Sequence, residues 1–260
     1  MNRTLKILRV IVLAILVLTV VIVIVVNLFA DRAVRVGIES TATRALNVEV
    51  SVSDVDLSIM SGKLVLQNLS IGNPPAYQHD KLLVLKNTEI EAEAKSLLSD
   101  VVNIRQIRID HVDVIIEQRS VSENNLHDVL QAASETDEWK KLRIDNLEIS
   151  DITVKVDLMT NPEQTEPVKL VLSPIRMTNL GRDNKMDIAA LLKEIIIAIG
   201  DSIVEEGIGV LPTDILGSMT STLSKTINLG TRIIEGKEGI GREITEGLRN
   251  LLKSAPDKEE

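Results

Sequence analysis

The sequence repeats an eight-residue pattern, which runs apolar, any, apolar, any, polar, apolar, any, apolar. Its copies are VSVSDVDL at Val50–Leu57, LVLQNLSI at Leu64–Ile71, IRIDHVDV at Ile107–Val114, LRIDNLEI at Leu142–Ile149 and LEISDITV at Leu147–Val154. Strict alternation predicts a strand with one buried face, but here the alternation slips by one residue at the polar position. Such a slip turns the following side chains to the opposite face, so we expect a β-bulge or tight turn there that keeps the apolar side chains together.

Bends at similar heights on successive strands predict a curved, mostly antiparallel, bulged β-sheet with an apolar concave face. Met60-Ser61-Gly62 favours a hairpin between the first two strands. Pro174 stands at the polar position of the last strand, where proline is tolerated. The concave face is either a trough for lipid acyl chains or a core packed against helices of the same chain. Its expected side chains are Val50, Val52, Val55, Leu57, Leu64, Leu66, Leu69, Ile71, Ile107, Ile109, Val112, Val114, Ile144, Leu147 and Ile149.

The N-terminal region contains a long apolar run. Val10–Ala30 has no charged residue, and as a helix rising about 1.5 Å per residue it would span roughly 30 Å of hydrocarbon. Arg3, Lys6 and Arg9 precede the run, which favours a cytoplasmic N-terminus. The run is longer than the core of a cleaved signal peptide, the alternative that we weighed. We therefore expect an uncleaved, single-pass transmembrane helix.

The composition changes after Gly181, where helical periodicity replaces alternation. Asp187–Glu206 predicts a helix with a broad apolar face, and weaker helical signals follow. The fold class expected is α+β, a curved sheet covered by C-terminal helices. The expected divisions are a cytoplasmic N-terminus at 1–9, a transmembrane anchor at 10–30, the curved β-sheet domain at 33–181, an apolar helix packing on the sheet at 187–206, a C-terminal helical segment at 213–252 and a disordered tail at 254–260.

Composition narrows the classes of function. The net charge is −9 and the aromatic residues are Phe29, Tyr77 and Trp139 alone, so a nucleic-acid-binding surface is not expected. The chain has no Cys and shows no nucleophile elbow, P-loop or zinc-protease motif, so we expect neither an enzyme nor a cofactor. His111, within Asp110-His111-Val112-Asp113, has no second ligand at a suitable spacing, so no metal site is predicted.

The order of several motifs resembles the N-terminal module of the AsmA-like family of envelope proteins. After the apolar run, the motifs are the strand break at Gly62, Asn73-Pro74, the short turn Ser96-Leu97-Leu98-Ser99, Asn125-Leu126, and Leu180-Gly181 before an apolar helix. The resemblance covers roughly 33–206. It implies an inner-membrane protein with its main domain in the periplasm. The family is related in architecture to bridge-like lipid-transfer proteins, in which a curved β-groove holds acyl chains.

Two hypotheses follow from these observations. In the first, the protein is an anchored envelope protein that binds or guides membrane lipid in a short apolar β-groove and contributes to envelope lipid homeostasis. In the second, it is a non-enzymatic scaffold or adaptor whose apolar face is filled by its own helices. In that case residues 213–252 would bind an envelope partner or a second copy of the chain. An open trough in the structure would favour the first hypothesis, and a covered face would favour the second.

Overall fold

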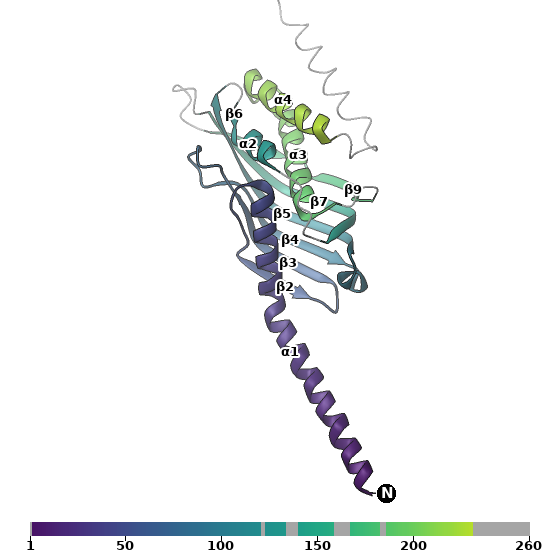
Figure 1. The fold of residues 1–260 in the computed structure, drawn as a ribbon. Coiled ribbons are helices and arrows are strands. Elements are labelled where there is room, and N and C mark those ends of the chain that lie inside the picture. Colours follow the sequence, from purple (N-terminus) through teal and green to yellow (C-terminus); the bar gives the residue numbers. More distant parts are fainter. Residues whose placement is uncertain (1, 121–122, 134–139, 159–166, 183–185, 231–260) are drawn as a thin grey trace, which may run out of the picture.

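The computed structural model describes residues 2–120, 123–133, 140–158, 167–182 and 186–230. The first element is one long helix, α1 (Asn2–Leu46), which ends at Asn47 in the left-handed conformation (φ 54°). Its N-terminal part extends away from the domain and its C-terminal part packs on the sheet (Figure 1). The apolar run at 10–30 is therefore part of one longer, continuous helix.

Within the residues that the structure describes, no helix combines the length and the apolar character that crossing a membrane requires. The structure thus does not support the transmembrane helix of the predicted fold, and the anchor stays a prediction from the sequence.

The strands form one nine-stranded sheet in the order β1-β3-β4-β5-β7-β8, with β2 beside β3, β6 beside β5 and β9 beside β7. Their bounds are β1 Val50–Ser51, β2 Asp54–Ser58, β3 Lys63–Gly72, β4 Lys81–Ala92, β5 Val101–Ser120, β6 Glu123–Asn124, β7 Lys141–Leu158, β8 Val168–Leu172 and β9 Ile175–Leu180. The neighbouring strands are antiparallel except β5 and β7, which are parallel. The prediction of an α+β fold with a mostly antiparallel sheet is confirmed.

Three of the slips in alternation, at Asn68, His111 and Asp151, fall on one line across the sheet. In each strand pair, one position on each strand is skipped by the residue pairing of the ladder. The skipped residues are Asn68 and Lys86 between β3 and β4, Lys86 and His111 between β4 and β5, and His111 and Asp151 between β5 and β7. Asn68, His111 and Asp151 have positive φ angles of 49°, 59° and 53°. The register is the same on both sides of the line, so no strand carries an extra residue there.

The bulge predicted at the polar position is therefore wrong for these copies. The alternation changes at the same level in neighbouring strands. A single residue in the left-handed conformation is therefore enough to keep the apolar side chains that follow it on the concave face, and no unpaired extra residue is needed. Register shifts do occur elsewhere, between Ile71 and Gly72 and between Glu91 and Ala92. The line also passes through the gap between β1 and β2 and the gap between β8 and β9. β1 and β2 pair with β3 in the same register, and β8 and β9 pair with β7 in the same register.

The hairpin between β2 and β3 turns where the sequence predicts. Gly62 has a φ angle of 70°, and a Cβ atom on it would lie 2.1 Å from the carbonyl oxygen of Ala92. Glycine is thus required both by the backbone conformation and by the close approach of β4.

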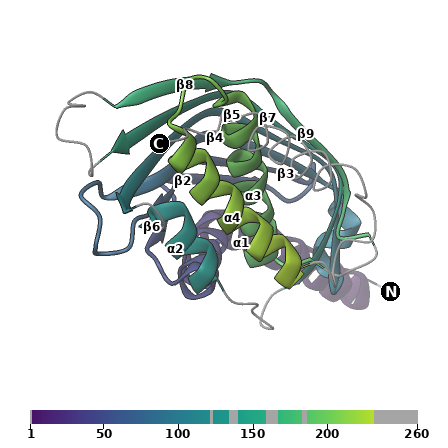
Figure 2. The ribbon, with the colours of Figure 1, turned by 90° about the horizontal axis from the view of Figure 1, so that it is seen from above.

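Helices cover the concave face in a second layer. These are the C-terminal part of α1, α2 (Asn125–Ala132), α3 (Ile188–Glu206) and α4 (Thr213–Gly230), over which the sheet arches (Figure 2). Buried side chains from all four helices and from the sheet form one hydrophobic core. Only the first part of the predicted 213–252 segment is described, as α4. Its remainder and the predicted disordered tail at 254–260 lie outside the described residues.

The packing of α1 closes the first edge of the sheet. Asp31, Arg35, Glu39 and Thr43 are spaced four residues apart and so share one face of the helix. Their side chains bond the backbone of the edge strands: Leu57 N–H donates to Asp31 (2.9 Å), Arg35 donates to the Ser53 carbonyl (3.0 Å), Val52 N–H donates to Glu39 (2.8 Å), and Val50 N–H donates to Thr43 (2.9 Å). These bonds satisfy edge groups that would otherwise be open to another strand.

Candidate functional site

The predicted concave residues gather on one continuous apolar surface. Ile107, Ile109, Val112 and Val114 of β5 are buried on the same side, although the slip at His111 separates the pairs. Of the predicted set, all are buried except Leu57 and Leu64, which are half-buried. Every residue of the set except Leu57 belongs to one hydrophobic core or packs against it, so the pattern identified a real structural unit.

The apolar surface is occupied by the chain's own helices. In α3 the buried side chains recur every three or four residues and include Leu192, Ile195, Ile199 and Ile203. At Gly200 an added Cβ would lie 3.0 Å from a Leu223 methyl of α4 and 3.2 Å from a Leu126 methyl of α2. The three helices therefore pack closely around this glycine.

Both ends of α3 are bonded to the sheet. At its start, the Asp187 carboxylate accepts from Ala190 N–H (2.8 Å) and lies 3.8 Å from Lys141 Nζ of β7. At its end, the Glu206 carboxylate accepts from Ser173 N–H, with distances of 2.9 and 3.2 Å to its two oxygens. Ser173 lies in the gap between β8 and β9. The helix is thus fastened across the sheet as well as packed on it.

Little space remains beneath the helices. One apolar void lies between the sheet, α2 and α3, and its volume is about 10 Å³. That volume accommodates at most about one water molecule. The residues that line it are Leu82, Leu83, Val114, Leu126, Ile196 and Ile199. In the described residues, the concave face is accordingly filled and has no room for an acyl chain at this place.

A buried carboxylate organises the end of the sheet next to α2. Glu117 of β5 has no exposed surface, and its carboxylate accepts from Asn73 Nδ2 (2.9 Å), Gln78 N–H (2.8 Å) and His79 N–H (2.9 Å). Asn125, at the start of α2, accepts from Glu117 N–H (3.0 Å). The site therefore ties the loop after β3 to β5 and α2. Sequence reasoning missed Glu117, whose one signal is a charged residue directly after the apolar Ile115-Ile116.

Tyr77 lies in the same loop and reaches the side of α2. Its hydroxyl donates to Asp128 (2.6 Å), and Arg119 lies over its ring at 5.5 Å. Burial, followed by the hydrogen bond to Asp128, raises the pKa of the Tyr77 hydroxyl well above its usual range. The group stays protonated at physiological pH and acts as a hydrogen-bond donor that fixes the loop.

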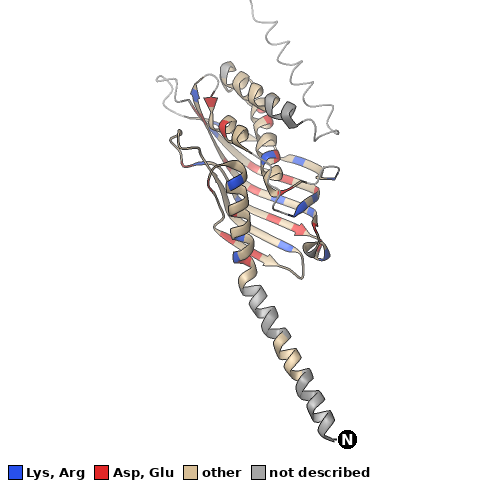
Figure 3. Ribbon diagram, in the orientation of Figure 1, with Lys and Arg blue, Asp and Glu red and all other residues tan. Residues whose placement is uncertain are grey.

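Acidic and basic residues lie along the strands of the sheet (Figure 3), and several of them form ion pairs on the convex face, opposite the buried aliphatic side chains. Lys86 Nζ lies 2.7 Å from Asp113, and His111 lies 3.2 Å from Asp151. The hydrogen bond from Lys86 to Asp113, with their charge attraction, raises the pKa of Lys86. Among the described residues, no group of three or more His, Cys, Asp or Glu side chains is arranged to hold a metal ion.

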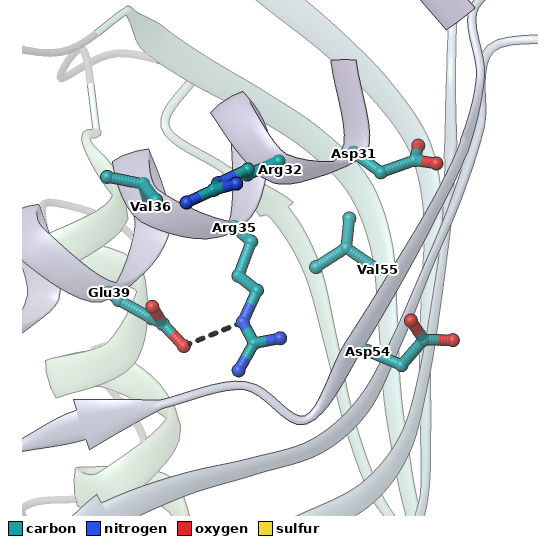
Figure 4. Close-up of a pocket in the computed structure, with 7 residues that line it drawn as sticks. All are labelled: Asp31, Arg32, Arg35, Val36, Glu39, Asp54 and Val55. Carbon is teal, nitrogen blue, oxygen red and sulfur yellow. Dashed lines mark hydrogen bonds and ion pairs between the residues drawn. The ribbon is translucent and has the colours of Figure 1, made fainter. Parts of the chain in front are cut away.

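A wide crevice lies where α1 meets the edge strand β2 (Figure 4). Its volume is about 570 Å³, and, unlike the concave face, it is lined mostly by charged residues. Its lining residues are Asp31, Arg32, Arg35, Val36, Glu39, Asp54 and Val55. Arg35 bonds Glu39 across one wall at 3.1 Å. The sequence analysis named none of its charged residues as a site, although Asp31, Arg35 and Glu39 recur every four residues.

A family model described as the AsmA family matches residues 1–178. No curated protein matches the chain. The matched region runs from α1 into β9 and ends before α3, so it contains the sheet but neither α3 nor α4.

Proposed function

Because the chain belongs to the AsmA family, whose members are envelope-associated proteins with lipid-related roles, we propose that it is a non-enzymatic envelope scaffold whose concave face is filled by its own helices. The observation that carries the proposal is the burial of the concave face beneath α3, which is bonded to the sheet at both ends. A module closed in this way offers its outer surfaces and edges to other molecules.

Photo-crosslinking of the full chain in membranes tests whether the face is filled. A photoreactive residue in place of Val114 faces the void shared with Ile196 and Ile199. A filled face predicts crosslinks to peptides of α3. Val171, which is 65% exposed, is the matched control and should give no α3 product. Crosslinks from position 114 to lipid, without α3 peptides, would contradict the scaffold proposal.

A second candidate function is lipid binding in the concave groove after α3 and α4 leave it. One observation favours it: the family match ends at residue 178, so α3 and α4 lie beyond the matched region. The predicted lipid-contacting residues would then line an open trough. An engineered disulfide between Leu126→Cys and Gly200→Cys would hold α3 against α2. It should abolish lipid exchange between vesicles if the groove must open, and the reduced protein should recover the activity.

The proposal extends to the location of the protein. We place residues 10–30 in the inner membrane as a single-pass anchor, with the N-terminus cytoplasmic and the β-domain periplasmic. Support comes from the uncharged run and from the exposed apolar side chains on the projecting part of α1, namely Leu13, Ile15, Leu16, Val17, Leu18 and Phe29. A C-terminal alkaline phosphatase fusion should be active. Extraction of the chain from membranes by alkaline carbonate would contradict an anchor.

The partner surface is proposed to include residues 213–252, of which α4 is the described part. Either an envelope protein or a second copy of the chain would bind there. Crosslinking in intact cells should yield a discrete product that is lost when 231–252 is deleted. A chain that stays monomeric and uncrosslinked would contradict this part of the proposal.

A further inference from the structure

The crevice between α1 and β2 has rigid walls. The strand wall is held to the helix through Asp31, which accepts from Leu57 N–H, and through Glu39, which accepts from Val52 N–H. Arg35 bonds both Glu39 and the Ser53 carbonyl. Side chains that line a crevice held in this way lose little freedom when a ligand binds, which favours affinity.

Charged groups of both signs in the crevice are left available. Among the described residues, the side chains of Arg32 and Asp54 make no hydrogen bond or ion pair, and both residues are exposed. Arg35 uses two of its five N–H donors in the bonds described above. Figure 4 shows Arg35 extending from the helix toward the strand wall, where Asp54 lies. The crevice therefore presents guanidinium donors together with a free carboxylate.

This combination matches a zwitterionic group. Guanidinium forks bind phosphate through paired hydrogen bonds, and a free carboxylate accepts from an ammonium group. A simple anion such as sulfate would be repelled by Asp54 and by the carboxylates of Asp31 and Glu39. A purely cationic ligand could pair with Asp54 but would leave the available guanidinium donors of Arg32 and Arg35 without an anion.

Apolar surface leads out of the crevice along α1. Val36 lines the crevice and is 54% exposed, and Phe29, three residues before Arg32, is 62% exposed. Exposed apolar side chains occur again at Leu13 and at Ile15–Leu18, and Leu13 lies roughly 24 Å from Phe29 along a helix axis. An amphiphile with its head in the crevice would therefore find apolar surface for its tail.

We propose that the crevice binds a phosphoethanolamine group, as carried by a zwitterionic phospholipid, with phosphate on Arg32 and Arg35 and ammonium on Asp54. The site rests on the proposed membrane anchoring, since α1 then holds the crevice at the membrane surface. Lipid contact at this place needs no opening of the filled concave face.

Native mass spectrometry of the full chain in nanodiscs tests the site. The discs contain equal amounts of phosphatidylethanolamine and phosphatidylglycerol, and the ratio of retained lipids is measured. The wild type should retain phosphatidylethanolamine preferentially. Asp54→Asn should reduce that preference roughly tenfold, the effect expected from one lost charge-assisted hydrogen bond. Arg32→Gln should weaken retention of both lipids.

Asp56→Asn is the matched control, because Asp56 is exposed on the same strand but does not line the crevice. It should bind as the wild type does. Equal lipid ratios for wild type and Asp54→Asn would overturn the site. If the chain does not enter nanodiscs at all, the anchoring proposal fails instead, so the two failures are distinguishable.

The phosphoethanolamine group could come from a membrane lipid or from a soluble ester, and a soluble competitor distinguishes the two. Glycerophosphoethanolamine should displace the retained lipid only weakly if a membrane lipid is the ligand, because the apolar contacts on α1 are missing. Displacement at equal concentration, lost in Asp54→Asn, supports the site and assigns it to a soluble ester. No displacement together with no lipid preference overturns the proposal.

Discussion

The two faces of the sheet are built by the same strands but carry different chemistry. On β5, Ile107 and Ile109 are buried beneath helices, whereas Arg108 between them pairs with Glu91 on the convex face at 3.4 Å. Burial of aliphatic side chains drives folding, while exposed ion pairs contribute little. We therefore expect buried contacts on the concave face to contribute most of the free energy of unfolding, and charge changes on the convex face to alter it little.

The largest expected effect is the loss of a concave side chain. Ile149→Ala removes a fully buried group of β7 and should lower the free energy of unfolding by about 2–5 kcal/mol. Urea unfolding of the full chain in detergent measures the loss. Val171→Ala, at an exposed apolar position, should change it by less than about 0.5 kcal/mol. Equal losses at both positions would break the distinction between buried and exposed apolar residues.

Substitution of Glu117 tests whether a buried carboxylate contributes to the stability of the protein by accepting hydrogen bonds from the loop after β3. Glu117→Ala leaves the amides of Gln78 and His79 without an acceptor and should cost roughly 3 kcal/mol. Hydrogen exchange at these two amides should accelerate. Glu205→Ala, at an exposed position, is the control. Unchanged protection of both amides in Glu117→Ala would show that the carboxylate does not hold the loop.

His111 tests the line of left-handed residues that lets both faces keep their character. His111→Val should destabilise the protein by about 1–2 kcal/mol, because a β-branched residue is strained at a φ angle of 59°. His111→Asn should be nearly neutral, since Asn tolerates this conformation. Thermal unfolding compares the two variants with Arg105→Val, an exposed strand position without positive φ. Similar stabilities for His111→Val and His111→Asn would contradict the role assigned to the conformation.

The smallest effect is expected for a convex ion pair. Arg176 donates to Glu148 with distances of 3.0 and 2.7 Å, and both side chains are at the surface. A double-mutant cycle with Arg176→Ala and Glu148→Ala should give a coupling of at most about 1 kcal/mol, decreasing with salt. A coupling as large as the Ile149→Ala effect would overturn the view that the convex face adds little stability.

Elements with local signals were predicted closely. The copy of the repeated pattern at 107–114 lies within β5 (Val101–Ser120), the copies at 142–154 lie within β7 (Lys141–Leu158), and the helix expected at 187–206 is α3 (Ile188–Glu206). The last strand was predicted as continuous through Pro174, but the structure divides it into β8 and β9. Alternation marks which residues share a face, whereas the end of a strand depends on its neighbour.

In the candidate site, too, some features follow from local sequence signals and others depend on contacts between distant segments. The burial of Val112 and Ile149 follows from the pattern, since apolar side chains at a fixed period leave water together. The parallel pairing of β5 with β7 joins residues about 40 positions apart, such as Ile109 with Ile149, and no local signal specifies it. The acceptor role of Glu117 likewise depends on Asn73 and Gln78, which only folding brings to it.

The sequence by itself determined the period of the strands, the positions of the slips, the apolar helix at 187–206 and the family, because each is written in the order of neighbouring residues. The tertiary structure decided that α3 covers the concave face, that α1 closes the edge at Val52 and Leu57, and that Arg32 and Asp54 share a crevice. These outcomes depend on contacts between distant segments, whose energies are settled only when the whole chain packs. The repeated pattern therefore specified an apolar face, and the tertiary structure determined that the chain's own helices cover it.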